Sequence, residues 1–156
     1  MKILVVGGGA REHALCWKLA QSLLVTELLC TPGNPGTGEV ARNLPFKVND
    51  LDGILDAVQE LEIDFVVVGP EEPLSLGLAD ELAKLRIPCF GPTKAAAQIE
   101  TSKQWAKAIM VAGNVPTGRS EAVTNLDQAR TALERFGLPV VIKADGLAAG
   151  KGVVVA

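Results

Sequence analysis

Residues 7–13 read GGGAREH and lie between an apolar run and a helical pattern, an arrangement that suits phosphate binding. Backbone N–H groups at the start of a helix, together with the positive end of the helix dipole, attract anions. Arg11 adds a guanidinium that can donate two parallel hydrogen bonds to a phosphate, and His13 adds a further polar contact. We therefore expect an anion site at this turn, although a glycine-rich turn alone can be purely structural.

The same segment lacks two features of a dinucleotide-binding loop. That fingerprint has a glycine at the position of Glu12, and it has an acidic residue at the end of the second strand to bind a ribose diol. Here the expected second strand ends in Cys30-Thr31-Pro32. An NAD-dependent oxidoreductase is therefore disfavoured, and a titration with NADH tests this alternative.

Two further glycine-containing loops, residues 32–37 (PGNPGT) and 69–74 (GPEEPL), each follow an expected strand. Loops that follow the strands of a parallel sheet lie at its carboxyl edge, where ligands bind. The Glu71 carboxylate suits the acceptance of hydrogen bonds from sugar hydroxyls, whereas Glu72 reads as an exposed carboxylate. Each motif alone would be an ordinary turn, but together the three loops predict one crevice.

A fourth glycine-rich segment, residues 145–152 (DGLAAGKG), is not a P-loop. Three residues separate Gly146 from Gly150 instead of four, no Ser or Thr follows Lys151, and a strand rather than a helix comes next. A strand-loop-strand flap with backbone amides and Lys151 can still close over a triphosphate. Lys143 on the preceding strand would direct its positively charged ammonium group at the same triphosphate.

Short apolar runs alternate with segments of helical period through the first ninety residues, which predicts an α/β fold with a parallel sheet flanked by helices. The expected strands are residues 3–6, 27–31, 65–68 and 87–90, with a helix capped by Asn49 and another at 76–85.

Beyond Thr93 the sequence becomes rich in alanine and lysine, which predicts helices at residues 94–100 and 103–112. A helix at 126–136 capped by Asn125, a strand at 140–144 and a strand from 153 complete the chain. We expect a substrate-binding domain over 1–93, a hinge over 94–117 and an incomplete domain over 118–156.

The 156 residues are 48% hydrophobic and 21% charged, with a formal net charge of -3, which provides no basic surface for nucleic acid. The apolar runs are far shorter than the roughly 18 residues that cross a bilayer, and no secretory leader is evident. With a single histidine and no Cys-x-x-Cys pair, no zinc site is expected. The three cysteines read as free thiols, so we expect a cytoplasmic protein without nucleic-acid or membrane partners.

Taken together, these segments resemble phosphoribosylamine-glycine ligase, also called glycinamide ribonucleotide synthetase, a family of the ATP-grasp superfamily. The resemblance spans the chain, and its most specific part is the string KADGLAAGKGV. It rests on residues 7–14, 33–37, 69–71, 102–103 and 143–153. The resemblance implies a pre-ATP-grasp, Rossmann-like sheet domain followed by the start of an ATP-grasp domain.

The resemblance further implies ligation of glycine to 5-phosphoribosylamine in purine biosynthesis, with ATP split to ADP and phosphate through a glycyl phosphate. Family chains are longer, so we expect an amino-terminal portion that is inactive alone, with the ligands of Mg²⁺ downstream of Ala156. The alternatives are a non-catalytic sugar-phosphate-binding module and a related ATP-grasp carboxylase, which would lack the string at 145–152.

The resemblance also assigns site residues, although it assigns no catalytic residue and no metal ligand within this chain. The residues implied to bind phosphoribosylamine are Gly9, Arg11, Glu12, His13, Gly33, Asn34, Gly36, Thr37, Gly69, Pro70 and Glu71. The residues implied to bind ATP are Lys103, Lys143, Asp145, Gly146, Gly150, Lys151 and Gly152.

Overall fold

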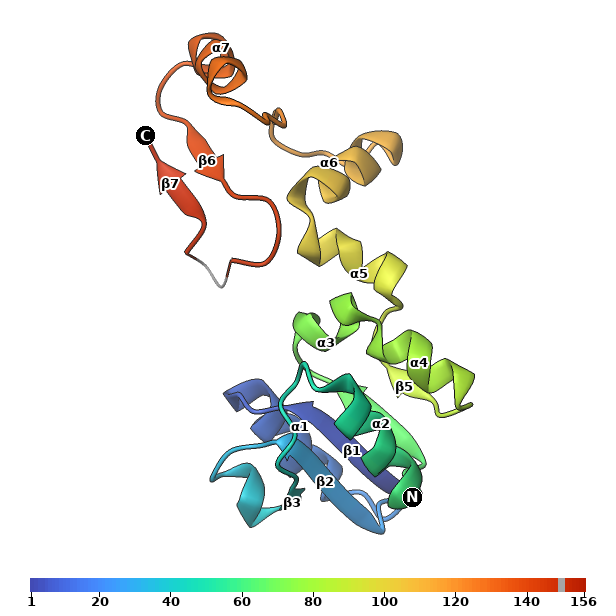
Figure 1. Ribbon diagram of the computed structural model, residues 1–156. Coiled ribbons are helices and arrows are strands. Elements are labelled where there is room, and N and C mark those ends of the chain that lie inside the picture. The colour runs from blue at the N-terminus through green and yellow to red at the C-terminus, as the bar shows by residue number, and fades with distance from the viewer. Residues whose placement is uncertain (149–150) are drawn as a thin grey trace. The chain divides into compact units, whose positions relative to one another are not determined.

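The computed structural model describes residues 1–148 and 151–156. The chain divides into two compact units, Met1–Ala97 and Gln98–Ala156 (Figure 1). This boundary falls within the segment 94–117 that the sequence predicts as a hinge. The elements before the boundary are β1 (Lys2–Gly7), α1 (Ala10–Leu19), β2 (Glu27–Pro32), the 3-10 helix η1 (Thr37–Glu39), β3 (Arg42–Asn43), α2 (Leu51–Glu60), β4 (Phe65–Val68), α3 (Glu71–Leu76), α4 (Leu78–Lys84) and β5 (Cys89–Phe90). Helix α5 (Lys94–Thr101) contains the boundary.

The first unit is built on a five-stranded parallel sheet with the strand order β3-β2-β1-β4-β5. The predicted parallel α/β sheet is thus confirmed. Its central strands β1, β2 and β4 are the apolar runs that the sequence marks as strands, because a parallel strand is covered on both faces. The short strand β3 was not expected, since Arg42-Asn43 is polar and too short to form a pattern.

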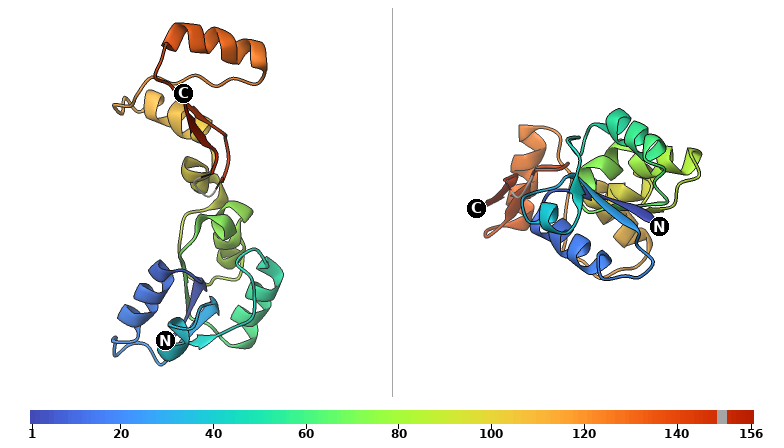
Figure 2. Two further views of the ribbon diagram at one scale, coloured as in Figure 1. Left: turned by 90° about the vertical axis from the view of Figure 1, so that its left-hand side faces the viewer. Right: turned by 90° about the horizontal axis from the view of Figure 1, so that it is seen from below.

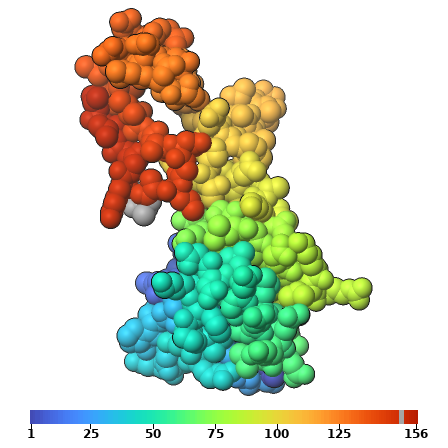
Figure 3. All heavy atoms as spheres, viewed as in Figure 1, coloured from blue at the N-terminus to red at the C-terminus, as the bar shows by residue number. Residues whose placement is uncertain are grey.

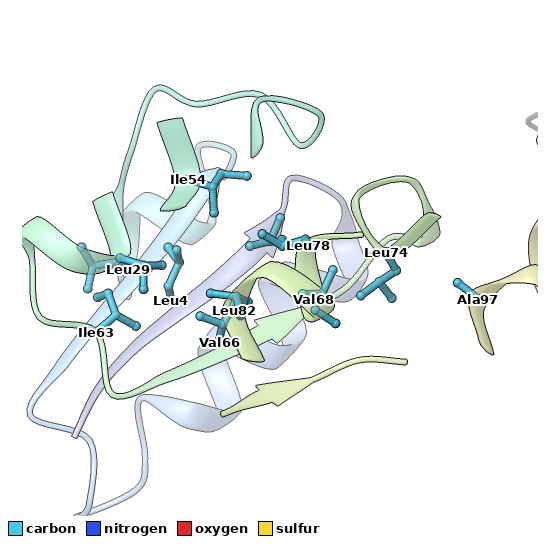
Figure 4. Close-up of a cluster of buried hydrophobic side chains, with 13 residues drawn as sticks. Leu4, Leu29, Ile54, Ile63, Val66, Val68, Leu74, Leu78, Leu82 and Ala97 are labelled. Carbon is cyan, nitrogen blue, oxygen red and sulfur yellow. The ribbon is translucent and has the colours of Figure 1, made fainter. Parts of the chain in front are cut away.

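Helices lie on both faces of the sheet (Figure 2). Side chains that alternate along β1 pack into the two clusters on these opposite faces. Leu4 and Val6 are fully buried in a cluster with α2 and α4, which Figure 4 shows around Ile54, Leu78 and Leu82. Ile3 and Val5 pack on the other face, against Cys16 of α1. Burial of each large apolar side chain contributes roughly 1.5–3 kcal/mol, so this two-sided core holds the strand ends in place.

Two expected helices differ in their limits. Asp50, not Asn49, caps α2, because the Asp50 carboxylate accepts a hydrogen bond from the Gly53 N–H at 3.2 Å. The helix expected at 76–85 is α4, which begins at Leu78, and α3 forms over Glu71–Leu76 in a segment that was expected to be a loop. The two helices are separated at Gly77, whose φ of 109° lies in the left-handed region that glycine adopts without strain.

The second unit contains α6 (Lys103–Ala112), α7 (Leu126–Phe136), β6 (Val141–Lys143) and β7 (Val153–Val155). The predicted N-cap of α7 is confirmed, since the Asn125 side chain accepts the Gln128 N–H at 2.9 Å. Strands β6 and β7 form an antiparallel pair, and their side chains lie at the surface of this unit (Figure 3). In the parts of the chain that the structure describes, every helix is too short or too polar to span a membrane.

Candidate functional site

Three loops begin at one edge of the sheet because β1, β2 and β4 are neighbours that run in the same direction. Gly7 at the end of β1 pairs in register with Pro32 at the end of β2, and Val6 pairs with Val68 at the end of β4. The loops that follow, residues 7–13, 33–37 and 69–71, are called the loop cluster below. All of the residues expected to bind phosphoribosylamine lie in it, and what they bind remains a prediction.

Hydrogen bonds join the second and third loops of the cluster to the first loop. The Gly33 N–H donates to the Gly7 carbonyl oxygen at 3.1 Å, and Asn34 Nδ2 donates to the Gly8 carbonyl oxygen at 3.0 Å. Arg11 Nη1 donates to the Gly69 carbonyl oxygen at 2.8 Å and so links the first loop to the third. The side chain of Arg11 is still 68% exposed, which leaves N–H donors of its guanidinium available to an anion.

Glu12 has an internal role in the loop cluster. It is 5% exposed, and its Oε2 accepts the Gly9 N–H at 2.7 Å at the start of α1. A Cβ on Gly69 would overlap the Glu12 carboxylate, so the third loop packs directly on it. One N–H at this helix start is therefore already bonded, and a negative charge already lies there. An anion at this turn would thus depend on Arg11 and the remaining amides rather than on the full helix terminus.

The second loop is shaped by a reciprocal pair of hydrogen bonds. The Asn34 N–H donates to Thr37 Oγ1 at 2.7 Å, and the Thr37 N–H donates to Asn34 Oδ1 at 3.0 Å. Thr37 is fully buried, and Asn43 Nδ2 donates to the Asn34 carbonyl oxygen at 2.8 Å. The contact between Asn43 and the second loop could not be predicted from the sequence, because it depends on the unexpected strand β3. The same side chain lies where a Cβ on Gly33 would stand.

His13, Gly36, Pro70 and Glu71 are the remaining residues of the loop cluster that were expected to bind phosphoribosylamine. The His13 imidazole lies against Gly36, at the position that a Cβ of Gly36 would occupy. Pro70 is the N-cap of α3, and Glu71 is the first residue of that helix. Glu71 is half-buried, which leaves part of its carboxylate accessible to a hydroxyl group.

The second candidate site lies in the second unit, where β6 and β7 are joined by the glycine-rich segment 145–152. Lys143 ends β6 and is exposed, as is Lys151 before β7. The Ala144 N–H donates to the Gly152 carbonyl oxygen at 2.8 Å and closes the base of the loop. Gly150, one of the residues expected to bind ATP, lies outside the described residues.

The Asp145 side chain bonds to the backbone of Lys103, and the Lys103 side chain bonds to the backbone of Gly146. Asp145 Oδ1 accepts the N–H groups of Lys103 at 2.6 Å and Gln104 at 3.3 Å, and the Ser102 hydroxyl donates to Asp145 Oδ2 at 3.1 Å. Lys103 Nζ in turn donates to the Gly146 carbonyl oxygen at 2.8 Å. Desolvation acts to raise the pKa of Asp145, but the hydrogen bonds donated to its carboxylate outweigh it and lower the pKa below the usual value.

Residues 1–148 and 151–156 contain no group of three or more His, Cys, Asp or Glu side chains that could hold a metal ion. The expectation that Mg²⁺ ligands lie downstream of Ala156 remains a prediction.

Comparison with known proteins assigns both units. A family model for phosphoribosylglycinamide synthetase, N domain, matches residues 1–100, and one for phosphoribosylglycinamide synthetase, ATP-grasp (A) domain, matches residues 101–156. The chain belongs to the phosphoribosylglycinamide synthetase family. The resemblance drawn from the motifs is thus confirmed, as is the order of a sheet domain followed by the start of an ATP-grasp domain.

Relatives in the phosphoribosylglycinamide synthetase family match the chain over its whole length. Phosphoribosylamine–glycine ligase of Xylella fastidiosa strain 9a5c is 51% identical over 100% of this chain and 36% of that protein. The ligase of Nostoc sp. is 48% identical over 100% of this chain and 37% of its own length. The chain therefore spans little more than a third of the length of these curated relatives.

Solved structures agree with this assignment. The crystal structure of phosphoribosylamine–glycine ligase from Thermotoga maritima has a TM-score of 0.79 at 34% identity, covering 99% of this chain and 36% of that one. N5-carboxyaminoimidazole ribonucleotide synthetase from Thermus thermophilus has a TM-score of 0.75 at 21% identity, covering 98% of this chain and 40% of that one. The second likeness shows a shared fold alone.

Proposed function

We propose that this chain supplies the amino-terminal part of a phosphoribosylamine-glycine ligase, which joins glycine to 5-phosphoribosylamine in purine biosynthesis and splits ATP to ADP and phosphate. The observation that carries the proposal is the loop cluster, in which three loops at the carboxyl edge of the sheet are bonded to one another. Relatives of that name at 51% and 48% identity support it.

The loop cluster is the proposed site for phosphoribosylamine. The guanidinium of Arg11 has five N–H groups, of which one on Nη1 donates to the Gly69 carbonyl oxygen and the one on Nε lies beside Glu12 Oε1, with 3.8 Å between the two heavy atoms. The remaining N–H groups on Nη1 and Nη2 can donate to the 5-phosphate, and N–H groups in the first turn of α1 add to this binding. Glu71 at the start of α3 is placed to accept hydrogen bonds from ribose hydroxyls. Glu12, which is buried, holds the first and third loops in place.

ATP is proposed to bind beside the β6–β7 pair, where Lys103, Lys143 and Lys151 supply positive charge. The chemistry needs that charge, because the γ-phosphoryl group moves from ATP to the glycine carboxylate and ADP leaves. The amine of phosphoribosylamine then attacks the acyl carbon, and the acyl phosphate bond breaks with release of phosphate. Lysine ammonium groups stabilise the negative charge that develops on the phosphoryl oxygens in the first step.

A chimaera tests the proposal directly. The 156 residues replace the matching amino-terminal part of the Xylella fastidiosa ligase, with which they align from end to end. ADP release is then measured with ATP, glycine and freshly made phosphoribosylamine. We expect turnover that requires all three substrates, and none from the isolated 156 residues. A folded chimaera that binds ribose 5-phosphate but releases no ADP would instead support a non-catalytic sugar-phosphate-binding module.

A variant of Arg11 assigns the substrate within the chimaera. Arg11→Ala removes the exposed guanidinium and should raise KM for phosphoribosylamine by roughly tenfold or more, the scale of a lost charge-assisted hydrogen bond, without changing KM for ATP. Arg42→Ala is the matched control, because Arg42 is also exposed and pairs with Glu27 at 3.1 Å on the sheet edge. Equal effects of the two substitutions on KM for phosphoribosylamine would contradict the assignment of Arg11.

A further inference from the structure

We propose that Asp145 is a positioning residue that fastens the first arm of the glycine-rich loop to the start of α6 and so directs the ammonium group of Lys103 to the nucleotide. This inference rests on the proposed ATP site for the part that concerns the nucleotide. The contacts themselves are those described above between residues 102–104 and residues 145–146.

The first observation is the reciprocity of these contacts. The Asp145 side chain bonds to backbone of α6, and the Lys103 side chain bonds to the backbone of the loop, through the Gly146 carbonyl oxygen at 2.8 Å. The two segments are more than forty residues apart in the sequence, with separations of 42 for Lys103 N to Asp145 and 43 for Lys103 Nζ to Gly146. Two bonds of opposite direction fix a relative position better than a single bond, because rotation about either one breaks the other.

The second observation concerns charge. Lys103 Nζ donates to a neutral carbonyl group, and within the described residues no ion pair joins it to the Asp145 carboxylate. The carboxylate instead accepts the N–H groups of Lys103 and Gln104, where it opposes the positive end of the α6 dipole. The helix terminus is thereby neutralised, whereas the ammonium retains its charge for an anion.

This arrangement has a consequence for recognition. A phosphate group cannot use the N–H groups of Lys103 and Gln104, because Asp145 Oδ1 already lies 2.6 and 3.3 Å from them. The start of α6 is therefore closed to the nucleotide at these two N–H groups, and the lysine side chains around the loop supply the positive charge. Lys103 has three N–H donors on Nζ, and the one bond that it makes within residues 1–148 and 151–156 is to Gly146, so the others can bind phosphoryl oxygens.

The wild-type chain provides the first test, and no substitution is needed. Amide ¹⁵N shifts of Lys103 and Gln104 are followed by NMR as the pH is lowered. We expect both signals to titrate together with a midpoint below the ordinary Asp value of about 3.9, because their common acceptor is held ionised by these bonds. Amides that do not titrate, or that titrate with separate midpoints, would overturn the proposal.

The isosteric variant Asp145→Asn provides the second test. Hydrogen exchange at Lys103 and Gln104, and at Ala144, whose N–H donates to Gly152 at the base of the loop, should accelerate roughly tenfold or more, the scale of one or two lost charge-assisted bonds. In the chimaera, KM for ATP should rise by a similar factor while kcat changes little. Lys103→Met should also raise KM for ATP, but it should leave exchange at the Lys103 and Gln104 amides unchanged, since their acceptor remains.

Asp80→Asn is the matched control, because Asp80 Oδ2 accepts the Lys94 N–H at 2.7 Å at the start of α5, in the same manner but in the first unit. It should alter neither exchange at Ala144 nor KM for ATP. If Asp145→Asn accelerates exchange only at Lys103 and Gln104, Asp145 merely caps α6 and the proposal is wrong. If the wild-type chimaera does not use ATP, the proposed function fails, whereas the NMR results still decide whether Asp145 fastens the loop.

Discussion

The contact between Glu12 and Gly69 gives the sharpest quantitative prediction for the loop cluster. Glu12→Ala removes a carboxylate that accepts the Gly9 N–H at 2.7 Å at the start of α1. A hydrogen bond to a charged group contributes about 1.5–3 kcal/mol, and a negative charge at a helix start about 0.3–1 kcal/mol. We therefore expect Glu12→Ala to lower the free energy of unfolding of the first unit by roughly 2–4 kcal/mol. Glu12→Gln, which retains the shape and an acceptor, should cost about 1 kcal/mol.

Gly69→Ala approaches the same contact from the other side. Its Cβ would overlap the Glu12 carboxyl group, and overpacking of this kind costs about 1–3 kcal/mol. In the Glu12→Ala background the overlap disappears, so the second substitution should cost little. We expect the double variant to be more stable than the sum of the single effects predicts by about 1–2 kcal/mol.

Urea unfolding followed by tryptophan fluorescence measures this double-mutant cycle. The chain has two tryptophans, and Trp17 lies in the first unit whereas Trp105 lies in the second. A Trp105→Phe background therefore makes the signal report on the first unit alone. Glu39→Ala, at an exposed position, serves as a control that should change stability by less than about 0.5 kcal/mol. Strictly additive effects of the Glu12 and Gly69 substitutions would refute the direct contact on which the reasoning depends.

Three further predictions follow from single sites. Thr37→Val should cost about 1–3 kcal/mol in the same unfolding assay, because it leaves the buried Asn34 N–H without its acceptor, and Thr37→Ser should restore most of the loss. Burial raises the pKa of the Cys89 thiol to about 11, so the folded state binds more protons than the unfolded state above pH 9. The free energy of unfolding should therefore fall as the pH rises from 9 toward 11, and Cys89→Ala should remove this dependence. Asn125→Ala should destabilise the second unit by about 1 kcal/mol, measured by Trp105 fluorescence in a Trp17→Phe background, because it removes the cap on the Gln128 N–H.

The parts of the fold that the sequence predicted are those set by local chemistry. β1, β2 and β4 are apolar runs that a parallel sheet buries on both faces. The limits of α6 and α7 follow from good helix formers that begin after Ser102 and Asn125, whose side chains accept the N–H groups of Trp105 and Gln128. Placement of the three loops at one edge follows from the direction of these strands alone.

The features that were missed depend on contacts between distant residues. β3 is a polar dipeptide that becomes a strand only because β2 offers it an edge. The break at Gly77 is invisible to helical periodicity, since apolar residues continue on both sides of it.

The roles of two side chains in the candidate sites could also not be predicted from local sequence patterns. Glu12 reads in the sequence as a polar residue of a binding loop, and its burial arises from packing against Gly69, which lies in the loop after β4. Asp145 reads as part of a nucleotide loop, and its partners on α6 lie more than forty positions earlier, with a separation of 42 to the Lys103 N–H. Neither role has a local signal, because each requires the chain to be folded first.

Binding of ribose 5-phosphate to the loop cluster is the most direct test of the central claim. Amide signals of the 156-residue chain are followed by NMR while ribose 5-phosphate, a stable relative of phosphoribosylamine, is added, with ribose as the uncharged control. We expect saturable shifts at Gly8, Gly9, Gly33 and Gly69, a weaker response to ribose, and a loss of affinity of roughly tenfold or more in Arg11→Ala. Saturation of signals only in residues 98–156, or equal affinity for ribose and its phosphate, would contradict the claim that this edge of the sheet binds a phosphorylated sugar.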